Sequence, residues 1–168
     1  MSIRLLALDV DGVMTDGTIL YTERGEEMKA FNTHDGLGMK YLRKAGVEIV
    51  VISGRQSKAL ERRLDDLGIR RRRLKCVDKT AALLDICDEL GISLDECAFM
   101  GDDLIDMDVM RQVGYALAPA NAVQEVKDLA GWVADKEGGR GAVREACDHI
   151  AGKIGVSLAD FVKLKENV

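Results

Sequence analysis

The alternation of short apolar runs with amphipathic stretches constrains the fold of this chain more than any other feature. Strands are expected at residues 3–8, 47–52, 74–77, 97–100 and 115–118 and around Trp132. Helices are expected at residues 35–45, 56–67, 79–90, 104–112, 142–154 and 158–165. Parallel strands need a crossover connection, which is usually a helix. The pattern therefore predicts a three-layer α/β fold, a Rossmann-like parallel sheet with helices on both faces.

One element departs from this alternation. Residues 17–23 and 27–32 predict a β-hairpin that turns at Arg24-Gly25. An isolated hairpin is marginally stable in water, so we expect it to pack on the body of the protein or on another subunit. No repeat or linker divides the 168 residues, which predicts a single domain spanning 1–168. Within it we expect a hairpin flap at about 17–33 and a C-terminal loop and helical tail at about 138–168, the last helix being capped by Ser157 and Asp160.

Composition argues against several classes of protein. The formal net charge of −5 and an aromatic content of 4% are atypical of nucleic-acid binding. No run approaches the roughly 18 apolar residues of a membrane span, so we expect no membrane partner. The four cysteines are too widely spaced for a metal-binding CxxC motif and are expected to be reduced thiols of a cytoplasmic protein.

Polar residues follow four of the predicted parallel strands at their carboxyl ends, where ligands of open α/β sheets bind. These residues are Asp9, Asp11, Ser53, Gly54, Arg55, Asp78, Lys79, Asp102 and Asp103. Taken singly, Ser53 and Asp103 are explained equally well as helix caps. Four strand ends that deliver such residues to one edge of the sheet instead predict a site.

Two of these carboxylates, Asp9 and Asp11, are only two residues apart after the first strand. Two carboxylates ~4 Å apart repel by about 4 kcal/mol at an effective dielectric constant of 20. A cation removes that penalty, and hard oxygen ligands with room for water and phosphate oxygens favour Mg²⁺, with Asp102 as a further ligand. An EF-hand is excluded because its fifth, sixth and twelfth positions hold Val13, Met14 and Leu20.

The ordered motifs DVDGVMTDG, SGR, a lysine at position 79 and GDD resemble those of the haloacid dehalogenase superfamily of Mg²⁺-dependent phosphotransferases. Because no inserted cap domain is expected, the chain resembles the small capless branch of this superfamily. Four longer stretches, FNTHDGLGMKYL, SGRQSKALERRLDDLGI, GDDLIDMDVM and GGRGAVREACD, resemble the family of 3-deoxy-D-manno-octulosonate 8-phosphate (KDO 8-phosphate) phosphatases, which act in lipopolysaccharide sugar synthesis. The resemblance implies a sugar-acid phosphate as substrate and a phosphoric monoester hydrolase.

The resemblance also implies residue roles. Asp9 would be the nucleophile that forms an aspartyl-phosphate, and Asp11 would protonate the leaving oxygen and then deprotonate water. Mg²⁺ would be held by the Asp9 carboxylate, the Asp11 carbonyl and the Asp102 carboxylate. Ser53, Gly54 and Lys79 would hold the phosphate, with Lys79 adding a positive charge against the transferring group.

Substrate contacts follow from the same resemblance. Arg55 stands where a relative specific for a nine-carbon keto acid carries an acidic residue, which favours the eight-carbon substrate. Arg55 is expected to begin the second helix and to share a face with Arg63, about 12 Å away along the axis. Either guanidinium suits a substrate carboxylate. The remaining substrate-binding residues implied are His34, Asp35, Gly36, Asp103, Asp106 and Arg140.

The resemblance implies a homotetramer in which the hairpin and the loop 138–141 cover a neighbouring site. Separately, the arginine run at residues 70–73 predicts a surface turn. Two other functions stay open. One is a phosphatase for the nine-carbon keto-acid 9-phosphate or for sugar phosphates more broadly. The other is a phosphoacceptor signalling domain without catalytic output, which also places carboxylates and a lysine at strand ends.

Overall fold

The computed structural model describes residues 2–162. A six-stranded parallel sheet in the order β5-β4-β1-β6-β7-β8 forms its centre. The strands are β1 (Leu5–Leu8), β4 (Glu48–Ile52), β5 (Arg72–Arg73), β6 (Cys97–Met100), β7 (Tyr115–Ala118) and β8 (Trp132–Val133). The predicted parallel α/β sheet is thereby confirmed.

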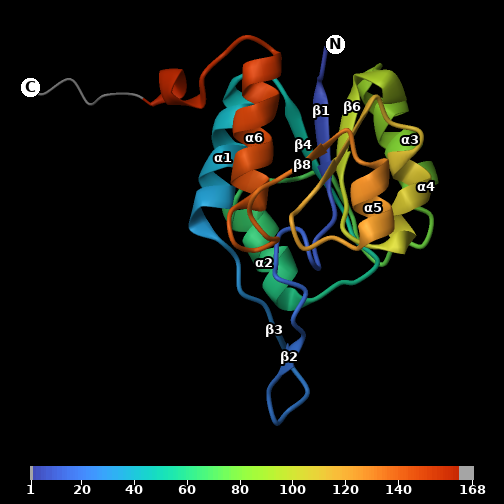
Figure 1. Ribbon diagram of the computed structural model, residues 1–168. Coiled ribbons are helices and arrows are strands. Elements are labelled where there is room, and N and C mark those ends of the chain that lie inside the picture. Colours follow the sequence, from blue (N-terminus) through green and yellow to red (C-terminus); the bar gives the residue numbers. More distant parts are fainter. Residues whose placement is uncertain (1, 163–168) are drawn as a thin grey trace, which may run out of the picture.

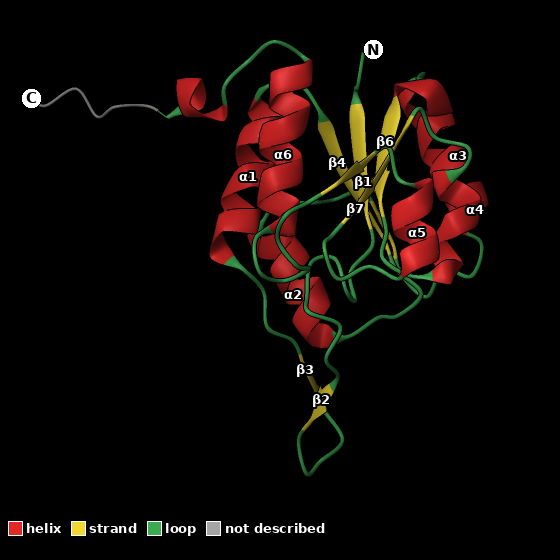
Figure 2. Cartoon of the chain, viewed as in Figure 1, coloured by secondary structure: helices red, strands yellow, loops and turns green. Residues whose placement is uncertain are grey.

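Helices cover both faces of this sheet (Figures 1 and 2). One face carries α1 (Thr33–Lys44), α2 (Lys58–Asp66) and α6 (Ala142–Lys153), and the other carries α3 (Lys79–Leu90), α4 (Met107–Met110) and α5 (Gln124–Leu129). Short 3₁₀ turns complete the chain at η1 (Leu94–Glu96), η2 (Leu104–Asp106) and η3 (Leu158–Phe161). Within residues 2–162, no helix is both long and apolar enough to cross a bilayer.

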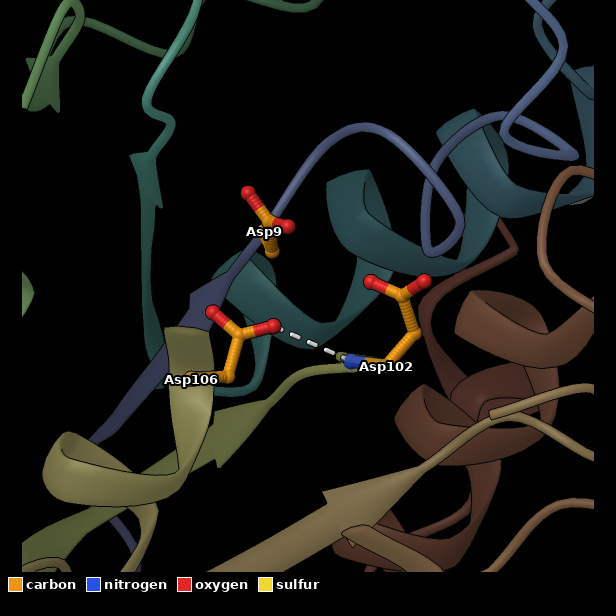
Figure 3. A group of neighbouring side chains, drawn as sticks. All are labelled: Asp9, Asp102 and Asp106. Carbon is orange, nitrogen blue, oxygen red and sulfur yellow. Dashed lines mark hydrogen bonds between the residues drawn. The ribbon is translucent and has the colours of Figure 1, made fainter. Parts of the chain in front are cut away.

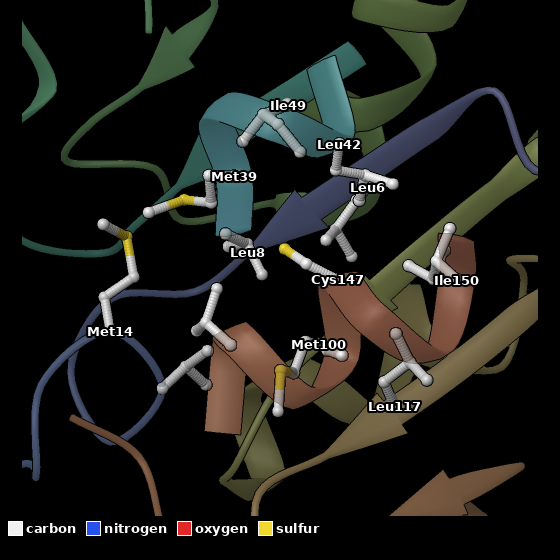
Figure 4. Close-up of a cluster of buried hydrophobic side chains, with 14 of the residues drawn as sticks. Leu6, Leu8, Met14, Met39, Leu42, Ile49, Met100, Leu117, Cys147 and Ile150 are labelled. Atoms are coloured by element: carbon white, nitrogen blue, oxygen red, sulfur yellow. The ribbon is translucent and has the colours of Figure 1, made fainter. Parts of the chain in front are cut away.

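The two cores follow from the alternation of side chains along each strand. In β1, Leu6 and Leu8 point into the core under α1, α2 and α6, whereas Leu5 and Ala7 point toward α3, α4 and α5. Figure 4 shows the first core, in which Leu6 and Leu8 meet residues of α1 and α6. Because β1 is buried on both faces, its sequence is apolar throughout.

Strand order determines where a ligand can approach the sheet. From β1 the chain crosses to β4 and β5 on one side, and β6 then pairs with the opposite edge of β1. The crevice beyond the carboxyl ends of β1 and β6 is therefore the topological switch point, the usual ligand site of such sheets. Asp9 and Asp102 follow these two strands.

The predicted hairpin consists of β2 (Leu20–Tyr21) and β3 (Glu27–Met28), which pair antiparallel. It projects away from the body at the carboxyl-end side of the sheet (Figure 1). Leu20 and Met28 pair across the hairpin on one face, and each is at least half exposed. The hairpin therefore leaves its apolar face unburied in the single chain.

Several predicted boundaries are wrong. The strand expected at 74–77 lies instead at Arg72–Arg73, and Val77 is fully exposed. The surface-turn reading of 70–73 is thus corrected: the short edge strand β5 pairs with β4, and ion pairs to Glu48, Asp65 and Glu89 hold its arginines and Arg71. Such a polar edge strand carries no apolar alternation by which a sequence reveals it.

Two predicted helices are also shorter than expected. Helix α2 begins at Lys58 behind the cap Ser57, so Arg55 lies in the preceding loop rather than on a helical face shared with Arg63. The stretch 104–112 divides into η2 and α4, while α5 was not predicted. The Ser157–Asp160 capping box is present and begins η3, and residues 163–165 of the predicted tail lie outside the described residues.

The C-terminal loop packs on the loop that follows β1 in the same chain. Gly139 donates its N–H to the Val13 carbonyl at 3.0 Å, and Arg140 pairs with Asp16 at 3.2 Å. A Cβ added to Gly138 would lie 1.8 Å from the Gly12 carbonyl oxygen. The loop thereby supports the backbone of the segment that carries Asp9 and Asp11.

We expect Gly138→Ala to lower the free energy of unfolding by about 2 kcal/mol, because one of two packed backbones must move. Gly152→Ala is the matched control: it lies in α6 with no atom near its added Cβ, and it is expected to raise stability by about 0.5–1 kcal/mol. Urea unfolding of both variants measures the difference. Equal stability of the two variants would contradict the packing role.

Candidate active site

Three carboxylates from separate segments converge at the switch point. Asp9 follows β1, Asp102 follows β6, and Asp106 ends η2. One oxygen of each lies within 4.8 Å of the others (Figure 3). The predicted meeting of Asp9 and Asp102 is therefore confirmed. Asp11 is not part of this cluster, so the crowding of Asp9 comes from Asp102 and Asp106 rather than from its sequence neighbour.

Lys79 partly neutralises this cluster. As the first residue of α3, it lies 5% exposed with its Nζ 2.9 Å from Asp9 Oδ1 and 2.6 Å from Asp106 Oδ1. The other Asp106 oxygen accepts the backbone N–H groups of Asp102 at 3.1 Å and Asp103 at 3.4 Å. Both oxygens of Asp106 are thus engaged, and this wholly buried side chain holds Lys79 and the loop after β6 in place.

One lysine does not balance three carboxylates, two of them buried and Asp102 half-buried. Burial, followed by the charges of Asp9 and Asp106, raises the pKa of Asp102 to about 7. Burial and the charge of Asp106 raise the pKa of Asp9 to about 6 despite the opposing Lys79. Asp102 Oδ1 is buried and has no hydrogen-bond partner. A hard divalent cation bound by Asp9 and Asp102 would satisfy this oxygen and remove the residual repulsion.

Gly12 keeps this space open. Its φ of +88° favours glycine, and a Cβ at this position would lie 1.9 Å from Asp102 Oδ2. The backbone of the turn after β1 therefore packs directly against the Asp102 side chain of the loop after β6. The DVDG motif has a glycine here because any side chain would displace the Asp102 carboxylate.

A pocket of about 150 Å³ opens at this cluster. Seven of its lining residues were predicted as site residues, and Ile105 is the eighth. The predicted ones are Asp9, Asp11, Ser53, Gly54, Arg55, Asp102 and Asp103. Ser53 is buried, and its Oγ accepts the Arg55 N–H at 3.2 Å. Asp103 caps η2 by accepting the Leu104 N–H at 2.7 Å.

Other predicted substrate residues lie outside the pocket lining. Arg63 donates to the Asn32 carbonyl at 3.0 Å, and its guanidinium passes so close to Gly36 that a Cβ there would lie 2.5 Å from it. His34 is exposed in the first turn of α1, and Arg140 is exposed beside Asp16. Gly36 and Arg63 therefore fix how the base of the hairpin joins α1 and α2.

The hairpin contributes two site residues that the sequence analysis missed. Lys29 forms ion pairs with Asp11 and, at 2.9 Å, with Glu27. Glu27 also accepts from Arg55 at 2.6 Å, and these contacts with Arg55 and Lys29 lower its pKa to about 2. In the sequence these residues look like the solvated face of a hairpin. The only available signal was that Glu27 and Lys29, two residues apart, share a face opposite the apolar Met28.

The chain has several relatives of known activity. A family model described as haloacid dehalogenase-like hydrolase matches residues 73–146. A KDO 8-phosphate phosphatase of Yersinia pestis is 44% identical over 149 residues, 89% of this chain and 80% of the relative. The chain belongs to the KDO 8-phosphate phosphatase family. An Escherichia coli member of this family is 44% identical over 147 residues, 88% of this chain and 78% of the relative.

Solved structures of KDO 8-phosphate phosphatases share the fold. The one from Moraxella catarrhalis contains a magnesium ion, a phosphate ion and a KDO molecule; its TM-score is 0.87 at 39% identity, covering 89% of this chain and 86% of that one. A cobalt-bound phosphatase from Haemophilus influenzae has a TM-score of 0.88 at 38% identity, covering 92% of this chain and 90% of that one. The family is thus one of metal-binding phosphoric monoester hydrolases.

Asp35 lies in the first turn of α1, outside the pocket lining, and contacts the beginning of α6. Its Oδ1 accepts the Arg144 N–H in the first turn of α6 at 2.8 Å, while its buried Oδ2 has no partner. Burial raises the pKa of Asp35 to about 6. The folded state therefore binds this proton more tightly than the unfolded state, so this group's contribution to stability falls as pH rises from about 4 to 6.

We expect Asp35→Asn to remove that pH-dependent loss while its amide oxygen still accepts from Arg144. Relative to wild type, the variant should gain about 2–3 kcal/mol of unfolding free energy between pH 4 and pH 7, since each pKa unit corresponds to about 1.4 kcal/mol. Urea unfolding of both proteins across this range measures the change. A difference that stays constant from pH 4 to pH 7 would show that folding does not raise the pKa of Asp35.

Proposed function

We propose that this protein is a Mg²⁺-dependent phosphatase that hydrolyses KDO 8-phosphate to KDO and inorganic phosphate through an aspartyl-phosphate. The observation that carries the proposal is the pair of buried Asp9 and half-buried Asp102, which Lys79 neutralises incompletely and in which the buried Oδ1 of Asp102 has no partner. The names of the relatives, and the magnesium, phosphate and KDO bound by one of them, support the same assignment.

In the first step Asp9 attacks phosphorus. Its carboxylate oxygen forms the new P–O bond as the bond to the sugar oxygen breaks. Asp11 donates a proton to the departing oxygen, which leaves as an alcohol. Ser53 and the Gly54 N–H hold the phosphate oxygens, and Lys79 places its positive charge beside the reacting carboxylate.

In the second step water cleaves the aspartyl-phosphate. Asp11, now a carboxylate, takes a proton from the water that attacks phosphorus, and the Asp9 carboxylate is released with inorganic phosphate. Mg²⁺ would be held by the Asp9 and Asp102 carboxylates and the Asp11 carbonyl. It supplies charge that offsets the repulsion between the phosphate and the carboxylates. Asp106 acts as a positioning residue because both its oxygens are already bound.

The substrate carboxylate is assigned to Arg55, which lines the pocket and is partly exposed. A planar guanidinium binds a carboxylate through two parallel hydrogen bonds. Arg63, His34 and Arg140 lie outside the lining of this pocket and are not assigned a contact with the substrate. We assign the eight-carbon rather than the nine-carbon acid as the substrate because Arg55 is present.

We assign the protein a homotetrameric, cytoplasmic state. The outward apolar face of the hairpin, together with exposed Val77 and Ile105 at the same end of the sheet, offers surface for a second chain. A marginal hairpin gains stability when this face is covered. The four cysteines are free thiols, as expected of a reducing compartment.

We expect purified protein with Mg²⁺ to release phosphate from KDO 8-phosphate faster than from the nine-carbon keto-acid 9-phosphate or common hexose phosphates. A chelator should stop the reaction and added Mg²⁺ should restore it. Asp9→Asn should fold normally but lose at least ~10³-fold in kcat, because an amide is no nucleophile. The measurement is phosphate release over this panel.

The same panel distinguishes the alternatives. Faster turnover of the nine-carbon substrate would move the assignment to the related phosphatase. Stable phosphorylation without turnover would favour a phosphoacceptor domain. Full activity of Asp9→Asn would exclude Asp9 as the nucleophile.

We expect sedimentation at micromolar concentration to give roughly four times the chain mass of 18.4 kDa. Leu20→Lys, on the exposed hairpin face, should shift the protein toward smaller species. Leu84→Lys, on an exposed position of α3, is the matched control and should leave the mass unchanged. A fully active wild-type monomer would contradict the assembly.

A further inference from the structure

We propose that Lys29 of the hairpin is a positioning residue for Asp11: it orients the Asp11 carboxylate and stabilises the negative charge that forms there when the proton moves to the leaving group. The proposal rests on the proposed function, because it concerns the acid of that reaction. It gives the hairpin a chemical role within its own chain's site, in addition to any role in assembly.

The contacts of Lys29 are those of a buried charge rather than of a surface side chain. Its side chain is 2% exposed, although the hairpin that carries it projects from the body. Its Nζ is bound by Asp11 Oδ1 and by Glu27 Oε1 at 2.9 Å. Asp11 and Glu27 are themselves only 23% and 11% exposed. Burying an ammonium so completely is costly unless its partners are fixed.

Glu27 fixes Lys29 from the opposite side. Its second oxygen accepts from Arg55 Nη2 at 2.6 Å, and the same guanidinium nitrogen lies 3.2 Å from the Tyr21 hydroxyl. Arg55 Nε in turn lies 3.8 Å from Asp11 Oδ2. The four charges alternate in sign around a closed circuit, so the hairpin is docked by its polar face. Lys29 binds one oxygen of the Asp11 carboxylate, and the Arg55 guanidinium lies near the other.

This arrangement gives Asp9 and Asp11 separate cations. Lys79 binds Asp9, and Lys29 binds Asp11. In the first step a proton passes from Asp11 to the departing sugar oxygen, the P–O bond to the sugar breaks and the bond to Asp9 forms. Negative charge therefore appears on Asp11 as the leaving group departs, and a fixed ammonium beside it lowers the energy of that transition state.

A purely structural role makes a different prediction. If Lys29 only docks the hairpin, its loss would affect all substrates that use the pocket to the same degree. A charge on Asp11 matters only when the leaving oxygen needs a proton. An alkyl phosphate such as the sugar-acid phosphate needs one, whereas p-nitrophenyl phosphate has a leaving group that departs as a stable anion.

The test compares kcat/KM for KDO 8-phosphate and for p-nitrophenyl phosphate in the full-length protein with Mg²⁺. This ratio of rate constants covers the steps up to transfer of the phosphoryl group. We expect Lys29→Met to lower kcat/KM for the sugar-acid phosphate by about 30-fold or more. This loss is a part of the roughly 10²–10⁴-fold that general acid catalysis contributes. The value for p-nitrophenyl phosphate should fall by less than about threefold.

Three further variants keep the result interpretable. Lys29→Gln serves as a second neutral variant if Lys29→Met fails to fold by circular dichroism. Lys29→Arg retains the positive charge and should recover part of the lost activity toward the sugar-acid phosphate. Lys40→Met is the matched control on an exposed position of α1 and should leave both activities unchanged.

Equal losses on the two substrates, or no loss on either, would overturn the positioning role. Failure of Lys29→Arg to exceed the neutral variants would also count against it. Failure of the proposed function is distinct, because wild-type protein would then not hydrolyse KDO 8-phosphate. Selective loss on the alkyl phosphate with recovery by arginine is the result that supports the proposal.

Discussion

The ion pairs of buried Lys79 with Asp9 and Asp106 are the interaction on which the rest of the site depends. Lys79 begins α3, Asp9 follows β1, and Asp106 lies in the turn after β6, so the three charges join the central strands to one helical layer. Breaking such a buried set by removing one partner leaves an uncompensated charge. Because Asp102 adds a third carboxylate, the set is also left with excess negative charge. That excess is what makes a divalent cation favourable at this position.

The sequence predicted the parallel sheet and the converging strand ends because both depend on short-range patterns. Apolar runs identify buried strands, and Asp9, Ser53 and Asp102 follow those runs directly. The place of Asp106 in the cluster with Asp9 was predicted less well. Asp106 lies four residues beyond Asp102 in a stretch that resembles helix, and its inward direction depends on the 3₁₀ turn η2. Asp11 is near Asp9 in sequence, yet it turns toward the hairpin.

The hairpin shows why the remaining site residues could not be read from the pattern. Alternation along a strand normally places apolar side chains inward, but here Glu27 and Lys29 face the site and Met28 faces outward. Which face is buried depends on what the hairpin meets in three dimensions, in this case Asp11 and Arg55. The same dependence explains the missed edge strand β5, whose position is fixed by pairing with β4 and by ion pairs rather than by apolar residues.

The two halves of the proposed reaction make opposite demands on the carboxylates that follow β1. Asp9 must be an unprotonated nucleophile, whereas Asp11 must first give up a proton and then take one. Two neighbouring carboxylates in one environment would titrate as a coupled pair and would not keep these roles apart. The fold gives the two carboxylates different partners. Asp9 contacts Lys79 and lies close to Asp102 and Asp106 at the carboxyl ends of the strands. Asp11 contacts Lys29 of the hairpin. In the proposed reaction, the projecting hairpin therefore supplies the cation that lies beside the acid Asp11.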